Sequence, residues 1–256
     1  MKKYILDLKV KINTQINHQY FLLILGSGSK LPKMLPGQFA EVRIDGSKDT
    51  FLRRPISIHF VDYPKNELWL LVQIVGKGTK QLSTYKQGDI LNLILPLGNT
   101  FTIPENRHEK LLLAGGGVGI APLLFLGSHL FEKGYKCDFL LGARSKNDLL
   151  QINEFQKYGT VFTTTEDGSD GEKGFVTHHS ILQNENFDKI YTCGPTPMMK
   201  AVAEYAEGKS IYCELSLENT MACGIGACLC CVTGTTEGNL CVCTEGPVFN
   251  STKLKW

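Results

Sequence analysis

The chain has 256 residues and a mass of 28.4 kDa, which is enough for two modest domains and a small additional module. Hydrophobic residues make up 43% of the chain, charged residues make up 20%, and the formal net charge is only +2. This composition predicts a globular protein without strong electrostatic attraction to nucleic acid or membranes. No secretory signal is recognisable after Met1, so we expect a cytoplasmic protein with reduced thiols.

Residues 1–104 have the pattern of short strands, in which apolar side chains alternate with polar ones and turns rich in Gly, Pro and Asp intervene. The expected strands are 6–12, 20–25, 38–44, 55–60, 67–75 and 89–95. Strands of this length and spacing predict an antiparallel β-barrel or sandwich.

Residues 105–215 alternate strands with helices, which predicts a doubly wound parallel sheet with helices on both faces. The expected strands are 110–114, 137–143, 160–165, 188–194 and 210–215, and the expected helices are 120–133, 148–158 and 197–208. The uncharged segment 111–131 is long enough to cross a membrane as a helix. Its glycine cluster and Pro122 favour a buried strand, a turn and a helix instead.

Two glycine-containing turns follow strands of this region. The first, GGGVGIAP at 115–122, is a GxGxxP variant of the dinucleotide fingerprint, and its backbone amides can approach a pyrophosphate; a purely structural turn is the alternative. The second, CGPTPMM at 193–199, ends another strand and should face the same crevice. Cys193 is either a small buried hydrophobic residue or a catalytic group beside a nicotinamide ring. The candidate nucleotide-binding residues are Gly115, Gly116, Gly117, Gly119, Gly194 and Pro195.

Residues 216–256 contain six of the nine cysteines. Cys223, Cys228 and Cys231 have the spacing C-x4-C-x2-C, which is typical of plant-type 2Fe–2S clusters when a more distant fourth cysteine follows. Spacing alone does not choose between Cys241 and Cys243 for that ligand. A zinc site fits the x4 spacing less well, and a simple redox dithiol is a further alternative. Disulfides are disfavoured by the expected reducing compartment and by the odd number of cysteines.

The barrel pattern, both glycine turns and the segment LRRPIS at 52–57 together resemble the ferredoxin–NADP reductase superfamily. The resemblance implies FAD in the barrel, with the Arg54 guanidinium on a phosphate, as suits its bidentate geometry. It also matches VGKGT at 75–79 to a second loop that contacts phosphate. The flavin-binding residues that it implies are Arg54, Pro55, Ile56, Ser57, Leu71, Val72, Gln73, Gly78 and Thr79.

The segments MACGIGACLCC (221–231) and CVCTEGPVF (241–249) resemble a narrower family, the electron-transfer subunits of type B dihydroorotate dehydrogenases. This resemblance extends over essentially the whole chain, including PGQF at 36–39 and PLGN at 96–99. In that family two residues separate the last cluster ligand from the GPVF segment, which selects Cys243. The resemblance therefore implies a metal site formed by Cys223, Cys228, Cys231 and Cys243.

The same resemblance implies three functional regions: an FAD-binding β-barrel (1–104), an NAD-binding α/β domain (105–215) and a 2Fe–2S cluster module (216–256). In the family, an FMN-containing catalytic subunit oxidises dihydroorotate, and electrons pass through the cluster and FAD to NAD+ during pyrimidine biosynthesis. We expect a heterotetramer with two copies of each subunit. Flavin must stand between the other centres because nicotinamide exchanges electrons in pairs and the cluster exchanges them singly.

Two other functions remain open. A related flavin and iron–sulfur subunit could couple NAD(P)H to ferredoxin or to a sulfur compound. A zinc-stabilised binding module with a vestigial nucleotide fold belongs to a different class. The choice of nucleotide is also open, because Arg144 and Lys146 follow a strand at a position where positive charge could meet the 2′-phosphate of NADP.

Overall fold

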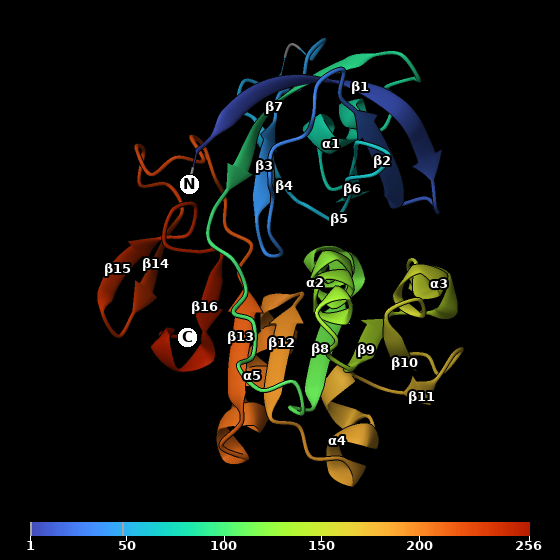
Figure 1. The fold of residues 1–256 in the computed structure, drawn as a ribbon, viewed down its shortest axis with the longest axis vertical. Coiled ribbons are helices and arrows are strands. Elements are labelled where there is room, and N and C mark those ends of the chain that lie inside the picture. The colour runs from blue at the N-terminus through green and yellow to red at the C-terminus, as the bar shows by residue number, and fades with distance from the viewer. Residues whose placement is uncertain (1, 48) are drawn as a thin grey trace.

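The computed structural model describes residues 2–47 and 49–256. An antiparallel sheet formed by the first hundred residues lies above a mostly parallel sheet, and the C-terminal segment lies beside both of them (Figure 1). The expected fold class, an antiparallel barrel-like sheet followed by a doubly wound domain and a small cysteine-rich module, is confirmed.

The first sheet has seven strands in the order β4-β3-β7-β1-β2-β6-β5. They are β1 (Tyr4–Gln15), β2 (Tyr20–Gly26), β3 (Phe39–Val42), β4 (Arg54–Ser57), β5 (Phe60–Asp62), β6 (Glu67–Gln73) and β7 (Ile90–Leu97). The single strand expected at 55–60 is two strands, because the chain changes partners at Ile58 and His59. The Ile58 N–H bonds to the Gln38 carbonyl, and the His59 N–H bonds to the Trp69 carbonyl on β6. One continuous segment therefore forms both edges of the sheet and curves it into a barrel.

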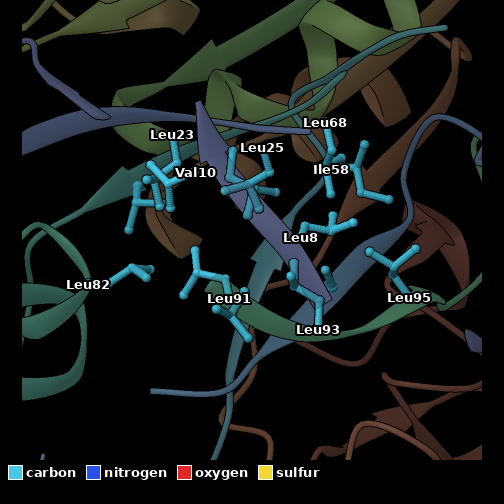
Figure 2. Close-up of a cluster of buried hydrophobic side chains, with 14 of the residues drawn as sticks. Leu8, Val10, Leu23, Leu25, Ile58, Leu68, Leu82, Leu91, Leu93 and Leu95 are labelled. Atoms are coloured by element: carbon cyan, nitrogen blue, oxygen red, sulfur yellow. The ribbon is translucent and has the colours of Figure 1, made fainter. Parts of the chain in front are cut away.

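Alternating apolar side chains fill the barrel, as the period-2 pattern of the sequence predicts. Leu8 and Val10 of β1 are completely buried and meet side chains of β2 and β7, and Figure 2 shows this cluster. Burial of each such side chain contributes about 1.5–3 kcal/mol to folding. The barrel core is thus specified by short-range sequence alternation.

Helix α1 (Lys77–Leu82) was not expected, since it occupies a connection that reads as a glycine turn. Leu82 enters the barrel core, and the Thr79 hydroxyl accepts hydrogen bonds from the N–H groups of Val75 and Gly76 at 2.9 and 3.2 Å. Six residues are too few for a recognisable helical period. The helix is stabilised by the burial of Leu82 in the barrel and by the local hydrogen bonds of Thr79.

The second sheet has the order β11-β10-β9-β8-β12-β13-β16, in which β16 alone is antiparallel to its neighbour. Its strands are β8 (Leu111–Gly116), β9 (Cys137–Ala143), β10 (Gly159–Thr165), β11 (Glu172–Lys173), β12 (Lys189–Cys193), β13 (Tyr212–Ser216) and β16 (Val248–Asn250). Its α-helices are α2 (Ala121–Glu132), α3 (Ile152–Phe155), α4 (Ile181–Asn184) and α5 (Thr196–Gly208). The 3-10 turns are Gly117–Ile120, Lys146–Asp148, Val176–His178 and Ser251–Lys253.

Segment 111–131 forms β8, a tight turn and most of α2, as predicted. Among residues 2–47 and 49–256, no helix combines the length and the apolar character needed to cross a membrane. The helix expected at 148–158 is wrong in extent, because only Ile152–Phe155 is α-helical. Gln151 adopts a left-handed backbone conformation with φ of 58°, which separates α3 from the preceding 3-10 turn.

The C-terminal segment has more regular structure than its Gly- and Thr-rich sequence indicates. β14 (Val232–Thr235) and β15 (Gly238–Cys241) form a hairpin, and β16 pairs with β13. The Asn99 side chain, just after β7, donates to the Glu245 and Val248 carbonyls at 2.8 Å. The core around Cys231 and Cys243 also includes Phe39 of β3 and Leu97 of β7. The cysteine module is therefore fastened to the barrel as well as to the parallel sheet.

Candidate functional site

A cavity of about 650 Å³ opens between the carboxyl ends of β8 and β12, where the strand order of the doubly wound sheet reverses. Open α/β sheets bind ligands at this position. The predicted nucleotide-binding residues that line it are Gly116, Gly117, Gly119, Gly194 and Pro195, and Val118, Pro197 and Met198 of the same two turns line it as well. Gln73 of β6 closes the barrel side of the cavity. The structure thus brings the two turns to one crevice, as the sequence predicted.

The two turns touch through backbone atoms. A Cβ on Gly119 would lie 2.4 Å from the Gly194 Cα and 2.6 Å from the Cys193 carbonyl oxygen. Such distances exclude any side chain at Gly119 without movement of the backbone. Glycine is therefore needed here so that β8 and β12 can end against each other and leave the cavity open.

Gly119→Ala should consequently destabilise the fold by about 1–3 kcal/mol, the usual effect of an added group in a packed site, and weaken NADH binding. Thermal unfolding and NADH titration of the same preparation would measure both effects. Gly208→Ala is the matched control, because a Cβ there meets nothing within 4 Å. Equal behaviour of the two variants would contradict the required close approach.

Two predicted residues of this region lie away from the cavity wall. Gly115 is a packing position, since a Cβ there would lie 2.8 Å from Leu123 and 2.9 Å from Ile120. Cys193 is only 1% exposed and is not among the residues that line the cavity. Burial, the largest influence, raises the pKa of the Cys193 thiol well above its ordinary value. The assignment of Cys193 to catalysis stays a prediction, and a role in nicotinamide chemistry would require this thiol to act in its protonated form.

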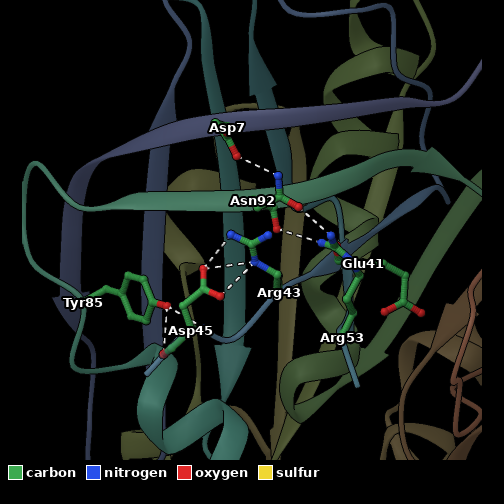
Figure 3. A network of polar contacts seen from close by, with 7 residues as sticks. All are labelled: Asp7, Glu41, Arg43, Asp45, Arg53, Tyr85 and Asn92. Atoms are coloured by element: carbon green, nitrogen blue, oxygen red, sulfur yellow. Dashed lines mark hydrogen bonds and ion pairs between the residues drawn. The ribbon is translucent and has the colours of Figure 1, made fainter. Parts of the chain in front are cut away.

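The barrel presents a second group of predicted residues. The Arg54 guanidinium lies over Gly78, where a Cβ would be 2.8 Å from Nε. The neighbouring Arg53 instead donates to the carbonyls of Glu41 and Asn92, at 3.2 and 3.0 Å. Figure 3 shows Arg53 within this network of the barrel. Arg53 thus supports the fold, while Arg54 stands at the loop that the resemblance assigns to phosphate.

The remaining flavin candidates have mixed surroundings. Pro55, Ile56 and Ser57 are half-buried on β4, whereas Leu71 and Val72 are only 2% and 1% exposed and belong to the cores. Only Gln73 of the β6 group lines the cavity. The Thr79 hydroxyl is already engaged within its own loop. From these positions, contacts of Leu71 or Val72 with a ligand would have to come from the backbone.

Sequence reasoning missed several residues of the cavity. Tyr20 of β2 lies opposite Gly117, and its hydroxyl accepts a hydrogen bond from the Gln73 side chain at 3.3 Å. Glu166 follows β10, and Glu218 follows β13. The position of Glu166 just after a parallel strand was an available signal. Tyr20 had none, because its approach depends on how the barrel rests on α2.

That junction is built from buried groups. His59 is completely buried, and its Nδ1 lies 2.8 Å from the Ala121 carbonyl at the start of α2. Burial lowers the pKa of His59 to about 4, so the ring is neutral near pH 7. Phe60 contacts both Phe125 of α2 and Tyr158, with ring centroids 6.3 Å apart in each pair. These contacts hold the barrel wall over the glycine turns.

All nine cysteines are free. The predicted ligands form two pairs: the Cys223 sulfur accepts from the Cys228 thiol, and the Cys231 sulfur accepts from the Cys243 N–H at 3.4 Å and lies beside the Cys243 thiol. The Gly226 N–H joins the pairs by donating to Cys243 Sγ at 3.1 Å. Among the described residues, no three His, Cys, Asp or Glu side chains surround one point closely enough to hold a metal ion.

Backbone N–H groups provide the charge stabilisation that thiolates need. The N–H of Ile225, followed by groups of Cys228 and Ala227, lowers the pKa of Cys223 to about 6. Burial, followed by the neighbouring Cys231 thiol, raises the pKa of Cys243 to about 12. A cysteine that binds a metal ion releases its proton on binding. The thiol of Cys241 also lies beside Cys231, but its backbone N–H bonds to Glu245 at 2.9 Å. Four thiols with N–H donors directed at sulfur are a suitable donor set for an iron–sulfur cluster.

Comparison with known protein families agrees with these sites. Residues 218–255 match the iron–sulfur cluster binding domain of dihydroorotate dehydrogenase B, and residues 113–204 match the oxidoreductase NAD-binding domain. The electron-transfer subunit of dihydroorotate dehydrogenase B (NAD(+)) from Shouchella clausii is 40% identical over 92% of both chains. That from Listeria innocua is 41% identical over 97% of this chain and 98% of its own.

The chain belongs to the family of dihydroorotate dehydrogenase B electron-transfer subunits. It is therefore an oxidoreductase subunit with an iron–sulfur binding domain and an NAD-binding domain. The two relatives have nearly the same length as this chain.

Solved structures agree with this membership at the level of the fold. A structure of an NADH-dependent reduced ferredoxin–NADP oxidoreductase, described in connection with flavin-based electron bifurcation, is 31% identical and superposes with a TM-score of 0.88 over 97% of this chain and 90% of its own. A ferredoxin reductase of carbazole 1,9a-dioxygenase is 20% identical with a TM-score of 0.70, over 82% of this chain and 67% of its own. The second likeness concerns the fold alone.

Proposed function

We propose that this chain passes electrons from dihydroorotate oxidation in an FMN-containing partner subunit, through a 2Fe–2S cluster and FAD, to NAD+ for pyrimidine biosynthesis. The observation that carries the proposal is the attachment of the cysteine module to the barrel. Asn99 bonds to that module on both sides of the Gly246–Pro247 turn, and Phe39 and Leu97 share its core. Such packing holds the cluster ligands next to the flavin-binding sheet, and short distances are what electron transfer needs.

The residues of the barrel suit FAD. The Arg54 guanidinium lies over Gly78, so a phosphate beside this loop can accept charge-assisted hydrogen bonds from it. When bound, FAD can exchange electrons in pairs with nicotinamide and singly with the cluster. The chain itself holds the nicotinamide nucleotide at Gly117 and Gly119, where Gln73 and Tyr20 shape the barrel side of the cavity.

Two features of the cysteines favour a 2Fe–2S cluster over zinc. Their arrangement in two pairs suits two iron ions with two thiolates each, whereas one zinc ion takes four thiolates around one point. The bond from Gly226 to Cys243 also connects the fourth thiol to the loop that carries Cys223 and Cys228. We therefore propose Cys223, Cys228, Cys231 and Cys243 as ligands, with Cys230 and Cys241 outside the set.

The nucleotide should be NAD. Glu166 lines the cavity after β10, and Lys146 lies 3.7 Å from Asp170, so negative groups oppose the positive ones. Arg144 also lines the cavity and lies close enough to Tyr20 to act on its hydroxyl. Since apposed like charges cost several kcal/mol and ~1.4 kcal/mol is tenfold, kcat/KM should be at least about tenfold higher for NADH than for NADPH.

Diaphorase assays with both nucleotides, on the wild type and on Glu166→Gln, measure this preference. Glu166→Gln should reduce the preference for NADH over NADPH, because the variant has no carboxylate facing the 2′-phosphate. Arg144→Gln is the comparison: if Arg144 received a 2′-phosphate, that variant would lose NADPH activity selectively, and the proposal of NAD would be wrong.

For the partner we propose an FMN-containing dihydroorotate dehydrogenase catalytic subunit in a heterotetramer of two copies of each chain, with no nucleic acid or membrane involved. The family name, which calls these chains electron-transfer subunits, supports a catalytic partner. We place the enzyme in the cytoplasm, since nine free cysteines are compatible with a reducing compartment.

The test is anaerobic purification of the chain alone, followed by its absorption spectrum and by counts of iron, sulfide and flavin. The proposal expects two irons, two sulfides and one FAD per chain, with NADH-dependent diaphorase activity and no dihydroorotate oxidation until the partner subunit is added. Zinc in a colourless protein, or dihydroorotate turnover by the chain alone, would overturn it.

A second candidate function is coupling of NAD(P)H to ferredoxin. It is favoured by the 0.88 TM-score to the NADH-dependent ferredoxin–NADP oxidoreductase structure. The two are distinguished by the rate of NAD+ reduction, measured once with dihydroorotate and the partner subunit as the donor and once with reduced ferredoxin as the donor. Reduction by ferredoxin alone would select the second candidate.

A further inference from the structure

A buried acidic side chain lies where the barrel meets the cysteine module. Glu41 is on β3, opposite Pro55 of the flavin-binding strand β4 on one side and Ile94 of β7 on the other. The side chain is completely buried, and neither carboxyl oxygen has a hydrogen-bond partner among the described residues. Figure 3 shows the carboxyl group pointing away from the network of Arg53 and Asn92.

The carboxyl group is directed at the loop that carries the first two cluster ligands. A Cβ on Gly224 would lie 2.6 Å from Glu41 Cγ and 2.9 Å from Oε1. Gly224 follows Cys223 directly and has a φ of +66°, so the loop turns sharply at this contact. Glycine at 224 therefore lets the cluster loop close over the Glu41 side chain.

Charges of both signs act on this carboxyl group. Burial is the largest influence and raises the pKa of Glu41 to about 7, while the guanidinium groups of Arg53 and Arg54 act in the opposite direction and the Cys223 thiolate acts with burial. An ionised carboxylate without hydrogen bonds is expensive to bury, and an uncharged carboxyl group is much less so. A protonated Glu41 would also offer an O–H donor to a loop whose sulfur atoms are anionic.

We propose that Glu41 is a positioning residue that seats the cluster loop on the flavin-binding sheet and that its contact with this loop raises the reduction potential of the cluster. Hydrogen-bond donors near cluster sulfur atoms favour the reduced, more negative cluster, and they are a known means of setting the potential. Since β3 pairs with β4, the same residue links the loop to the strand that carries Arg54. The inference rests on the iron–sulfur cluster of the proposed function.

The experiment is redox titration of the cluster, followed by electron paramagnetic resonance (EPR), in the full chain with the variants Glu41→Gln and Glu41→Ala. Glutamine has the same shape and keeps a donor, so its spectrum and midpoint potential should stay near those of the wild type. Alanine removes the contact, so its potential should become more negative and its spectrum should change. Glu237→Gln is the control, because Glu237 is an exposed carboxylate of the β14–β15 hairpin that pairs with Lys253.

Wild-type potential and spectrum in Glu41→Ala would overturn the proposal. A rise of the potential in Glu41→Gln would also overturn it, since that result means that an ionised carboxylate had been removed. Iron and sulfide are counted first on the wild type. Absence of a cluster at that stage would refute the proposed function, and it would be distinguished from failure of the inference about Glu41.

A double-mutant cycle gives an independent readout of the contact itself. Gly224→Ala should disturb the EPR spectrum in the wild-type background, because its Cβ meets Glu41. The disturbance should be smaller in the Glu41→Ala background, where that space is free. Equal disturbance in both backgrounds would show that only the left-handed backbone of Gly224 matters, and that Glu41 does not position the loop.

Discussion

Cys243→Ser is expected to abolish the cluster, while Cys241→Ser should leave it intact. The Gly226 N–H donates to Cys243 Sγ, and the Cys243 N–H donates to Cys231 Sγ, so Cys243 is fixed within the ligand loop from both directions. Loss of a direct ligand should reduce electron transfer from dihydroorotate to NAD+ by more than roughly a hundredfold, since even the outer hydrogen-bond partners of metal ligands account for 10–100-fold.

The measurement is iron and sulfide content together with the two activities. NADH-dependent diaphorase activity should persist in Cys243→Ser, because on the proposed electron path it requires the nucleotide cavity and the flavin but not the cluster. Cys230→Ser is a further control at an exposed thiol. A cluster retained in Cys243→Ser and lost in Cys241→Ser would show that Cys241 is the fourth ligand in place of Cys243. This is the alternative that the spacing of the cysteines left open.

The strands and the glycine turns could be predicted from the sequence because local rules determine them. Leu8 and Val10 alternate with polar residues, and GGGVG follows an apolar run, so each feature is visible within about ten residues. The spacing of Cys223, Cys228 and Cys231 is local in the same way, and the comparisons confirm the iron–sulfur binding domain around them. Short-range periodicity thus accounts for most of the architecture.

The features that the sequence did not reveal depend on contacts between distant segments. β16 is a three-residue strand that exists because β13 offers it an edge, and β4 separates from β5 only because Ile58 and His59 bond to different neighbours. Glu41 shows no unusual pattern along β3, since its significance comes from Gly224, far away in the sequence. Pairwise contacts of this kind leave no periodic signal in a single chain.

Arg54→Ala should remove most of the bound FAD, the largest effect that we expect from a single change in the barrel. The guanidinium lies against Gly78, and its Nη1 is held by the Leu52 carbonyl at 2.7 Å, so its position is fixed before any ligand arrives. Loss of two charge-assisted hydrogen bonds to a phosphate costs about 3 kcal/mol, and this weakens FAD binding roughly a hundredfold.

Reconstitution of flavin-depleted protein, followed by flavin fluorescence, gives the FAD dissociation constant. Arg43→Ala is the matched control, because Arg43 is exposed and pairs with Asp45 in the network of Figure 3, away from Gly78. Arg54→Lys should recover only part of the affinity, since an ammonium group cannot form the bidentate contact. If Arg54→Ala binds FAD as tightly as Arg43→Ala, the phosphate must lie elsewhere, and the contact of Arg54 with Gly78 would serve only to close the barrel.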